Sequence, residues 1–237
     1  MSSTGYVTLS RQGGLMNEMR IVANNIANAA TTGFRQEGVV FSEYIRTAPD
    51  QPSLSMSRAQ VRNTSMEQGA LTQTGGRLDL AIEGEGFFLI QTPAGQRLTR
   101  AGSFATSANG DLVTPEGHPV LDAGGAPVFV PAGVDIAIAG DGTISADGQP
   151  LGQVGLYLPA DPLQLKREDG VRFDSPAGIL PAENARLLQG FLEGSNVNPV
   201  LQIARMIEVQ RAYEMGQSFL ETEDQRIRNA VKTLIRS

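Results

Sequence analysis

Apolar residues near the N-terminus recur with the period of a helix that packs through a narrow seam. Two columns, each spaced by seven residues, alternate at intervals of three and four: Leu9, Met16, Ala23 and Ala30, with Met19 and Ile26. Such alternation is typical of a coiled-coil helix. The pattern predicts a helix from about Thr4 to Ala30, and Gly33 is a plausible stop signal.

The C-terminal pattern is longer and unbroken. The first column comprises Met206, Tyr213, Leu220, Ile227 and Leu234, and the second comprises Ile203, Gln210, Gln217, Asp224 and Val231. Asn198 is a good N-cap, and Pro199 suits the first helical position. A helix from Pro199 to Arg236 would be roughly 57 Å long at ~1.5 Å per residue. The second, mixed polar column favours a specified register and partner over maximal stability.

Each terminal helix needs a helical partner, and the simplest arrangement pairs the two. Some apolar residues lie off the seam: Val200, Ile207, Val209 and Phe219. Because a pair of helices cannot cover these as well, we expect helices of neighbouring subunits to do so. The alternative is an ordinary core helix packed over the rest of the chain, which this helix exceeds in length.

The middle of the chain reads first as an extended segment and then as many short strands. Residues 36–70, with Pro49 and Pro52, show no period and predict an extended arm or linker. From 71 to 190, apolar runs alternate with turn signals about every ten residues, as in all-β domains. The runs are 80–82, 87–90, 128–130, 134–138 and 154–158. The turns are Asn109-Gly110, Gly124-Gly125, Asp141-Gly142 and Asp147-Gly148.

The predicted fold class is therefore α+β, with the N- and C-terminal helices forming a coiled-coil stalk beside a central all-β domain. The predicted segments are a seam helix over 1–35, an arm over 36–70, a β domain over 71–190 and a coiled-coil helix over 191–237.

Composition narrows the function classes. The formal net charge is -6, which argues against nucleic-acid binding. Residues 1–35 carry +2 and residues 199–237 carry +1, so the middle holds -9. This distribution fits ends that pack against protein and a middle that faces water. No apolar stretch approaches the ~20 residues of a membrane span, so we expect no membrane insertion. Nor does the N-terminus show a basic region followed by an apolar block, so we expect no cleaved Sec-type signal.

No residue pattern predicts catalysis. His118, the one histidine, lies in a turn at 117–119 with no nucleophile motif near it. One histidine and no cysteine cannot supply the ligand cluster of a zinc site. Glu83 and Glu85 could suggest a hydrolase pair, but we interpret them as solvated carboxylates beside a turn. We expect no enzymatic activity, cofactor or metal.

Several ordered motifs carry a resemblance to a known family. Residues 23–35, ANNIANAATTGFR, fit the pattern A-N-N-[IL]-A-N-x-x-T-x-G-[FY]-[KR] throughout. The segments LDLAIEGEGFF (78–88), TRAGSF (99–104) and GDLV (110–113) follow in order. EGSNVN (193–198) and MIEVQRAYE (206–214) close the series. The chain thereby resembles the flagellar basal-body rod and hook proteins. The openings at 6–12 and the stretch 117–121 favour the proximal rod members. One departure from the family pattern lies at 201–203, which reads Leu-Gln-Ile.

The resemblance implies more than the composition does. Such proteins are exported unfolded by the flagellar type III apparatus without a cleaved signal. They assemble in the periplasm with copies of themselves and other rod proteins into a helical tube that transmits torque. The alternatives are a distal rod or hook-type axial protein, and an oligomeric module that binds a ligand through the β domain.

The predicted assembly surface joins the seam columns to the N-terminal motif. It comprises Leu9, Met16, Met19, Ala23, Asn24, Asn25, Ile26, Asn28, Gly33, Phe34, Ile203, Met206, Gln210, Tyr213, Leu220, Ile227, Val231 and Leu234. The amides of Asn24, Asn25 and Asn28 have poor helix propensity and can donate and accept hydrogen bonds. We expect them to bind neighbouring helices or backbone at the helix end. The alternative is helix-end capping alone.

Overall fold

Two units make up the chain, each defined by its own internal contacts. The structure, a computed structural model, describes residues 3–48, 51–131 and 133–236, with side chains for 8–39, 63–131 and 133–235. The helical unit comprises residues 1–27, 37–63 and 198–237, and the β unit comprises 28–36 and 64–197. Each is described by itself below.

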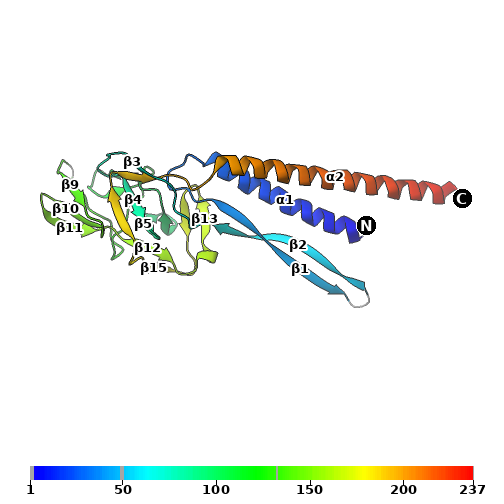
Figure 1. Ribbon diagram of the computed structural model, residues 1–237. Helices are drawn as coiled ribbons and strands as arrows, with labels where there is room; N and C mark the ends of the chain where they lie inside the picture. Colours follow the sequence, from blue (N-terminus) through cyan, green and yellow to red (C-terminus); the bar gives the residue numbers. More distant parts are fainter. Residues whose placement is uncertain (1–2, 49–50, 132, 237) are drawn as a thin grey trace. The chain divides into compact units, whose positions relative to one another are not determined.

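The helical unit pairs the two ends of the sequence. Helix α1 (Ser3–Ala27) and helix α2 (Pro199–Arg236) lie side by side and run antiparallel (Figure 1). This pairing confirms the α+β prediction. Asn198 caps α2 as predicted, because its Oδ1 accepts hydrogen bonds from the backbone N–H groups of Val200 (3.1 Å) and Leu201 (3.2 Å).

Helix α1 ends at Ala27, earlier than the predicted stop at Gly33. The chain turns at Asn28, whose carbonyl accepts from the Thr31 N–H (3.0 Å) and whose Oδ1 accepts from the Thr31 hydroxyl (3.2 Å). Short polar side chains of this kind compete with the helix for backbone groups. The asparagines therefore set the helix end, and Gly33 serves another purpose.

The segment predicted as an extended arm is a paired ribbon. Strands β1 (Glu37–Ala48) and β2 (Gln51–Thr64) form a two-stranded sheet (Figure 1). The extended backbone was predicted, but its pairing was not, because the segment lacks a regular apolar alternation. Pairing supplies hydrogen-bond partners to backbone groups that an isolated strand leaves to water.

The β unit holds the remaining strands. Their bounds are β3 (Leu71–Gln73), β4 (Leu80–Glu83), β5 (Phe87–Thr92), β6 (Gly95–Thr99), β7 (Ala105–Thr106), β8 (Leu112–Val113), β9 (Ile136–Ile138), β10 (Thr143–Ala146), β11 (Gln149–Gln153), β12 (Leu156–Pro159), β13 (Lys166–Asp169), β14 (Arg172–Asp174), β15 (Ile179–Pro181), β16 (Arg186–Gln189) and β17 (Phe191–Glu193). A 3-10 helix spans Pro162–Gln164. The largest sheet has the order β13-β14-β6-β5-β12-β15, and β11-β10-β9 form another. Three two-stranded sheets pair β16 with β4, β17 with β3, and β7 with β8.

Strand β5 lies at the centre of the core because both of its faces are buried. Phe88 and Ile90 point into one apolar cluster with β4 and Val120, while Phe87 and Leu89 point into another with Phe173. A continuous apolar run is what a strand covered on both sides requires. The predicted strands at 80–82 and 87–90 are confirmed. Those at 134–138 and 154–158 are confirmed in part. The run at 128–130 contributes only an isolated bridge, Asp111 to Phe129.

The four predicted turns contain glycines with positive φ, namely Gly110, Gly125, Gly142 and Gly148. Asp147 precedes the last of these and also has a positive φ of 49°. Two successive residues with positive φ are the signature of a type I′ hairpin. The turn chemistry of this unit was therefore readable from the sequence.

Gly33 is the one glycine of the N-terminal motif, and it lies where two backbone segments meet. Its φ is +71°, and a Cβ built there would lie 2.3 Å from the Ala101 backbone nitrogen. Gly75 has the same φ of +71° with nothing within 4 Å. The pair separates the two effects of a methyl group, namely backbone strain and steric collision.

Gly33→Ala should therefore destabilise the β unit far more than Gly75→Ala. Both substitutions carry the strain of a positive φ, about 1 kcal/mol, while the collision adds roughly 1–3 kcal/mol. Thermal unfolding of the two variants measures the difference, with a lower midpoint for Gly33→Ala. Equal midpoints would contradict the close approach.

Candidate assembly surface

The face of α2 that α1 covers forms a regular heptad stripe. Between residues 200 and 235, the positions that are not exposed are Gln202, Met206, Val209, Ala212, Tyr213, Gly216, Leu220 and Glu223. The predicted column of Met206, Tyr213 and Leu220 is part of this stripe. Its companion column is Gln202, Val209, Gly216 and Glu223, one residue earlier than predicted.

The predicted companion column is instead exposed. The exposed residues are Ile203, Gln210, Gln217, Asp224 and Val231. The prediction chose this column because it contains Ile203 and Val231. Hydrophobicity misled because Ile203 is exposed, whereas Gln202 and Glu223 take covered positions.

On α1 the difference between the predicted and the observed buried face is larger. Three polar side chains are buried, and the two predicted apolar columns are not. Gln12, Glu18 and Asn25 are buried. Leu9, Met16, Ala23 and Ala30, the predicted first column, are exposed, and Met19 and Ile26 are half-buried. Val22 and Ile21 supply the buried apolar contacts.

Each buried polar group of α1 has a defined partner within the helical unit. Asn25 donates from Nδ2 to the Glu37 carbonyl (2.8 Å) and to Gln202 Oε1 (3.2 Å), and its Oδ1 accepts from the Glu37 N–H (3.0 Å). Asn25 therefore ties the start of β1 to both helices. With a side chain that satisfies donor and acceptor together, it can pair fully in a site that excludes water.

Two further contacts continue this polar seam. Glu18 accepts from Arg205 Nε (2.7 Å), and Gln12 donates to the Tyr213 carbonyl (3.2 Å). The hydrogen bond to Glu18 raises the pKa of Arg205. Gly216 leaves room for Gln12, whose Nε2 lies 2.9 Å from where a Cβ would stand. Residues 25, 18 and 12 thus meet 202, 205 and 213, which fixes one antiparallel register.

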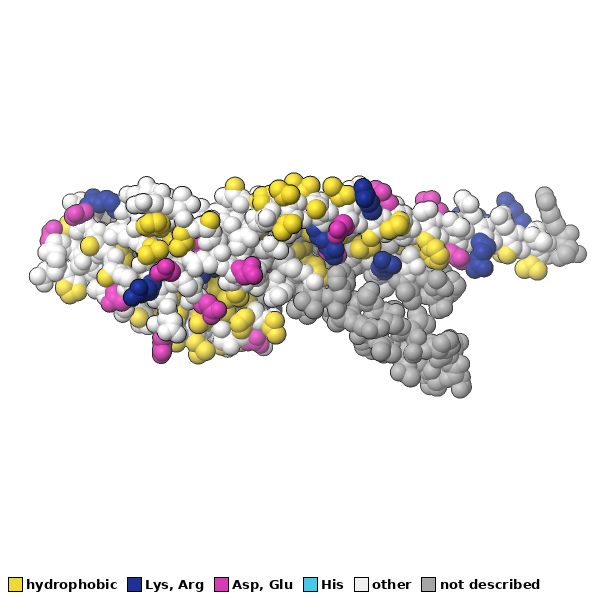
Figure 2. Space-filling model, in the orientation of Figure 1, with side chains coloured by type: hydrophobic (Ala, Val, Ile, Leu, Met, Phe, Trp, Pro, Cys, Tyr) yellow, Lys and Arg dark blue, Asp and Glu magenta, His cyan; other side chains and the backbone are white. Residues whose placement is uncertain are grey.

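Exposed apolar side chains lie outside this seam. On α2 they are Val200 (75% exposed), Leu201, Ile203 (50%), Ile207, Met215, Phe219, Ile227, Val231, Leu234 and Ile235. Figure 2 shows such side chains gathered over the first turns of α2. The helix pair therefore buries several polar groups beside Ile21, Val22 and Val209, and it leaves many apolar groups exposed. A self-sufficient bundle would cover more of these apolar groups.

Helix α2 also extends beyond the start of α1 (Figure 1). The register of the seam places Ser3 opposite about residue 222, so the rest of α2 projects by roughly 20 Å at ~1.5 Å per residue. The overhang, defined as residues 224–236, carries Ile227, Val231 and Leu234, which belong to the predicted surface and are exposed.

Three residues of the predicted surface are buried within the chain itself. Asn25, Gly33 and Phe34 are inaccessible to a neighbour in this conformation. Asn24 and Asn28 are half-buried. The N-terminal motif thus shapes the subunit from within, through the turn at Asn28, the node at Asn25 and the close approach at Gly33.

In the β unit, the motif ends in a buried ion cluster that sequence reasoning missed. Arg35 Nη2 lies 3.0 Å from Glu193 Oε1, and Arg100 Nε lies 3.3 Å from Glu193 Oε2, with all three side chains at most 2% exposed. Glu193 Oε1 also accepts from the Gly69 N–H (2.9 Å), and Arg100 Nη2 donates to the Gly84 carbonyl (2.6 Å). The available signal was the presence of a charged residue in each of the N-terminal, central and C-terminal motifs.

The cluster contains two cations and one anion. Burial lowers the pKa of Arg100 to about 10, although the Glu193 carboxylate acts in the opposite direction. Burial likewise lowers the pKa of Arg35. Glu193 is therefore the charge that makes burial of both guanidinium groups tolerable.

Phe34 and the C-terminal motif complete this junction. The Arg167 guanidinium lies 4.3 Å from the centroid of the Phe34 ring, a cation–π arrangement. Asn196 accepts from the Gln36 N–H (2.6 Å) and donates to the Glu67 carbonyl (2.8 Å). The three motifs of the resemblance thus meet at one place inside the β unit.

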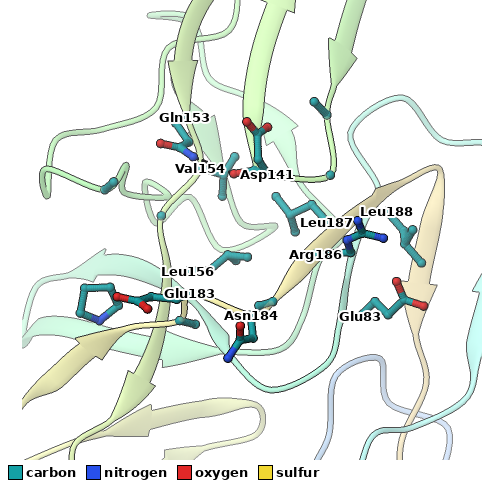
Figure 3. A pocket seen from close by; sticks show the side chains of 17 residues that line it. Glu83, Asp141, Gln153, Val154, Leu156, Glu183, Asn184, Arg186, Leu187 and Leu188 are labelled. Atoms are coloured by element: carbon teal, nitrogen blue, oxygen red, sulfur yellow. Dashed lines mark hydrogen bonds between the residues drawn. The ribbon is translucent and has the colours of Figure 1, made fainter.

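The β unit also has an open cleft of about 950 Å³ near the start of β16. Figure 3 shows its lining, which includes Leu187 and Val154 together with Glu83, Glu183 and Arg186. Asp141 is held by Thr143, which donates to it from its N–H (2.9 Å) and hydroxyl (3.0 Å). These hydrogen bonds lower the pKa of Asp141, the backbone one most.

Among residues 8–39, 63–131 and 133–235, whose side chains the structure describes, there is no group of three metal-ligating side chains. His118, predicted to be a surface turn residue, is half-buried with its Nε2 2.6 Å from Arg172 Nη1. Neither helix, as far as the structure describes it, is long and apolar enough to cross a membrane.

Comparison with known proteins decides the family. Residues 6–35 match the family "Flagella basal body rod protein", 81–146 match "Flagellar hook protein FlgE/F/G D1 domain", and 188–233 match "Flagellar basal body rod FlgEFG protein C-terminal". The flagellar basal-body rod protein FlgF of Mesorhizobium japonicum is 39% identical over 99% of this chain and 98% of its own length. FlgF of Caulobacter vibrioides has the same identity and coverage. FlgG of Buchnera aphidicola from Acyrthosiphon pisum is 35% identical over 87% of this chain and 90% of its own length.

This chain belongs to the flagellar basal-body rod protein family. The resemblance drawn from the sequence motifs is confirmed, including the nearer likeness to FlgF than to FlgG. The rod protein family is a structural one, in agreement with the prediction that the chain is not an enzyme. The matched segments cover most of α1 and α2 and contain all three members of the ion cluster, Arg35, Arg100 and Glu193.

Asn25→Ala in this rod-family chain should loosen the helical unit. It removes the Asn25 side chain from its hydrogen bonds to the buried N–H and carbonyl of Glu37, and loss of a partner at a buried polar group costs about 1–3 kcal/mol. Far-UV circular dichroism should show helix loss at lower temperature, whereas Ala23→Ser, at an exposed position, should leave the melting curve unchanged. A melting curve unaltered by Asn25→Ala would show that the node does not hold the helices.

Glu193→Gln should destabilise the β unit severely. Two buried guanidinium groups then lack their counter-ion, and breaking a buried ion pair in this way costs about 3–5 kcal/mol. The matched control is Glu183→Gln, at an exposed position, with no expected change. Urea unfolding followed by intrinsic tyrosine fluorescence measures the stability of both variants. Equal midpoints would contradict the role of Glu193 as the counter-ion of the two arginines.

Proposed function

We propose that this chain is a structural subunit of the proximal flagellar rod, which assembles through its two terminal helices with copies of itself and with other rod proteins. The observation that carries the proposal is the polarity of the helical unit, with Gln12, Glu18 and Asn25 inside and Leu9, Ile203 and Phe219 outside. Apolar surface exposed on this scale marks an interaction site.

The proposal includes the route and place of action that the family resemblance implies. The subunit is exported by the flagellar export apparatus without a cleaved signal, and it assembles in the periplasm into a helical tube that transmits torque. The identity to FlgF over nearly the full chain supports the proximal position. A distal position is the alternative, supported by the 35% identity to a FlgG.

Assembly is assigned to the exposed members of the predicted surface. The buried members, Asn25, Gly33 and Phe34, act by fixing the shape of the subunit. The seam members Met206, Tyr213 and Leu220 hold α1 on α2. The exposed residues then remain for neighbours, among them Leu9, Met16, Ile203 and the apolar residues of the overhang.

Substituting the overhang tests the proposal. The triple variant Ile227→Asp, Val231→Asp, Leu234→Asp changes a region past the reach of α1, so the seam within the subunit stays intact. In a flagellated bacterium that carries this gene in place of its own, we expect loss of motility and no basal-body rods containing the variant. Swimming assays and electron microscopy of basal bodies measure the two effects.

The control is Leu163→Asp, at an exposed apolar residue of the β unit (68% exposed). It should leave motility and rods intact, because it lies outside the helices assigned to assembly. Normal rods from the triple variant would overturn the assignment. Failure of the unmodified chain to enter rods at all would overturn the proposed function.

A further inference from the structure

The outer side of α1 presents a continuous stripe at heptad spacing. Its positions alternate four and three residues apart and are all exposed: Leu9, Gly13, Met16, Arg20, Ala23 and Ala27. The stripe lies away from the polar seam at Glu18 and Asn25. Apart from Arg20 it is apolar or small, so another helix can approach it closely.

A second side of α2 presents a matching stripe of the same period. Its positions are Val200, Ile203, Ile207, Gln210, Glu214, Gln217 and Glu221, again all exposed. The first two turns are bulky and apolar, with Val200 75%, Ile203 50% and Ile207 45% exposed. The following turns are polar and acidic, and Glu214 and Glu221 stand seven residues apart.

We propose that the α1 stripe of one copy packs along this α2 stripe of a second copy. The inference rests on the proposed function and names the two faces and their register. Ala27 faces Ile207, and Arg20 faces Glu214. The two stripes cannot meet within one subunit, because the seam already occupies α2 with the opposite side of α1.

Charge decides the register. Sliding the stripes so that Ala27 covers Ile207 brings the one cation of the α1 stripe, Arg20, level with Glu214. From Ala27 to Arg20 and from Ile207 to Glu214 the distance is the same, seven residues or about 10 Å. Opposite charges beside an apolar seam select partner and register more than they add affinity.

Direction follows from the subunit itself. Within one copy α1 runs antiparallel to α2. Copies related by rotation about, and translation along, an axis near-parallel to the helices keep their helix directions. The α1 of one copy is therefore antiparallel to the α2 of the next. The contact uses two different faces, so each added copy leaves one of each face open for further growth.

Cysteine cross-linking tests this contact directly, because the natural chain has no cysteine. Cells co-express Ala27→Cys and Ile207→Cys variants, one with an epitope tag, in place of the natural gene. Basal bodies are isolated and oxidised, and mixed dimers are quantified on non-reducing gels. A disulfide requires Cα atoms within ~7 Å, so we expect a mixed-dimer yield about tenfold above that of Ala27→Cys with Met215→Cys, a residue on another side of α2.

A second matched pair tests direction. Gly13→Cys with Ile207→Cys would link if the two helices ran parallel, and we expect no such link. Rods that form normally and show equal yields for all pairs, or a stronger link at Met215 or Gly13, would overturn the inference and leave the proposed function standing. Absence of the unmodified chain from rods would overturn both.

Charge reversal provides an independent readout. Arg20→Glu and Glu214→Arg should each reduce swimming speed and rod incorporation, and the double variant should restore both. Defects that simply add in the double variant would overturn the pairing of Arg20 with Glu214. Neither residue belongs to the seam within the subunit, so unfolding of the isolated variants should match that of the natural chain.

Discussion

The structure of the helical unit depends on a polar seam between two helices from opposite ends of the sequence. Asn25, Glu18 and Gln12 each find one partner on α2, and the three contacts together define one register. Buried polar groups contribute little net stability, but leaving one unpaired is costly. The seam thus selects one alignment rather than the most stable one. It also fixes which apolar side chains face outward, and these carry the proposed assembly.

The burial of polar side chains in the seam and the exposure of apolar ones explain where sequence reasoning succeeded and failed. The existence of α2, its start at Asn198 and the pairing of the ends followed from the heptads and the cap. The companion column did not, because Ile203 is more hydrophobic than Gln202 yet is the exposed one of the two. Periodicity predicts that a helix has an apolar and a polar face. Which face meets which partner depends on hydrogen bonds that only the folded chain brings together.

The β unit shows the same division. The double-sided burial of β5 and the glycine turns were readable from the sequence, because each depends on residues close together in the chain. The cluster of Arg35, Arg100 and Glu193 was not, because its members are separated by 65 and 93 positions. The pairing of β1 with β2 was likewise missed, since Pro49, Pro52 and many polar residues interrupt any alternation along the whole segment. Motifs marked these positions as notable without revealing that they touch.

The ion cluster has a consequence for the order in which the chain acquires its structure. Its anion comes from the last strand before α2, and one of its cations comes from the segment just after α1. Contacts that span so much of the sequence form late and slow folding, because the loop they close is long. A chain that is still incomplete and lacks Glu193 has no counter-ion for the two guanidinium groups that the folded β unit buries. The β unit therefore completes its fold only when nearly the whole polypeptide is present.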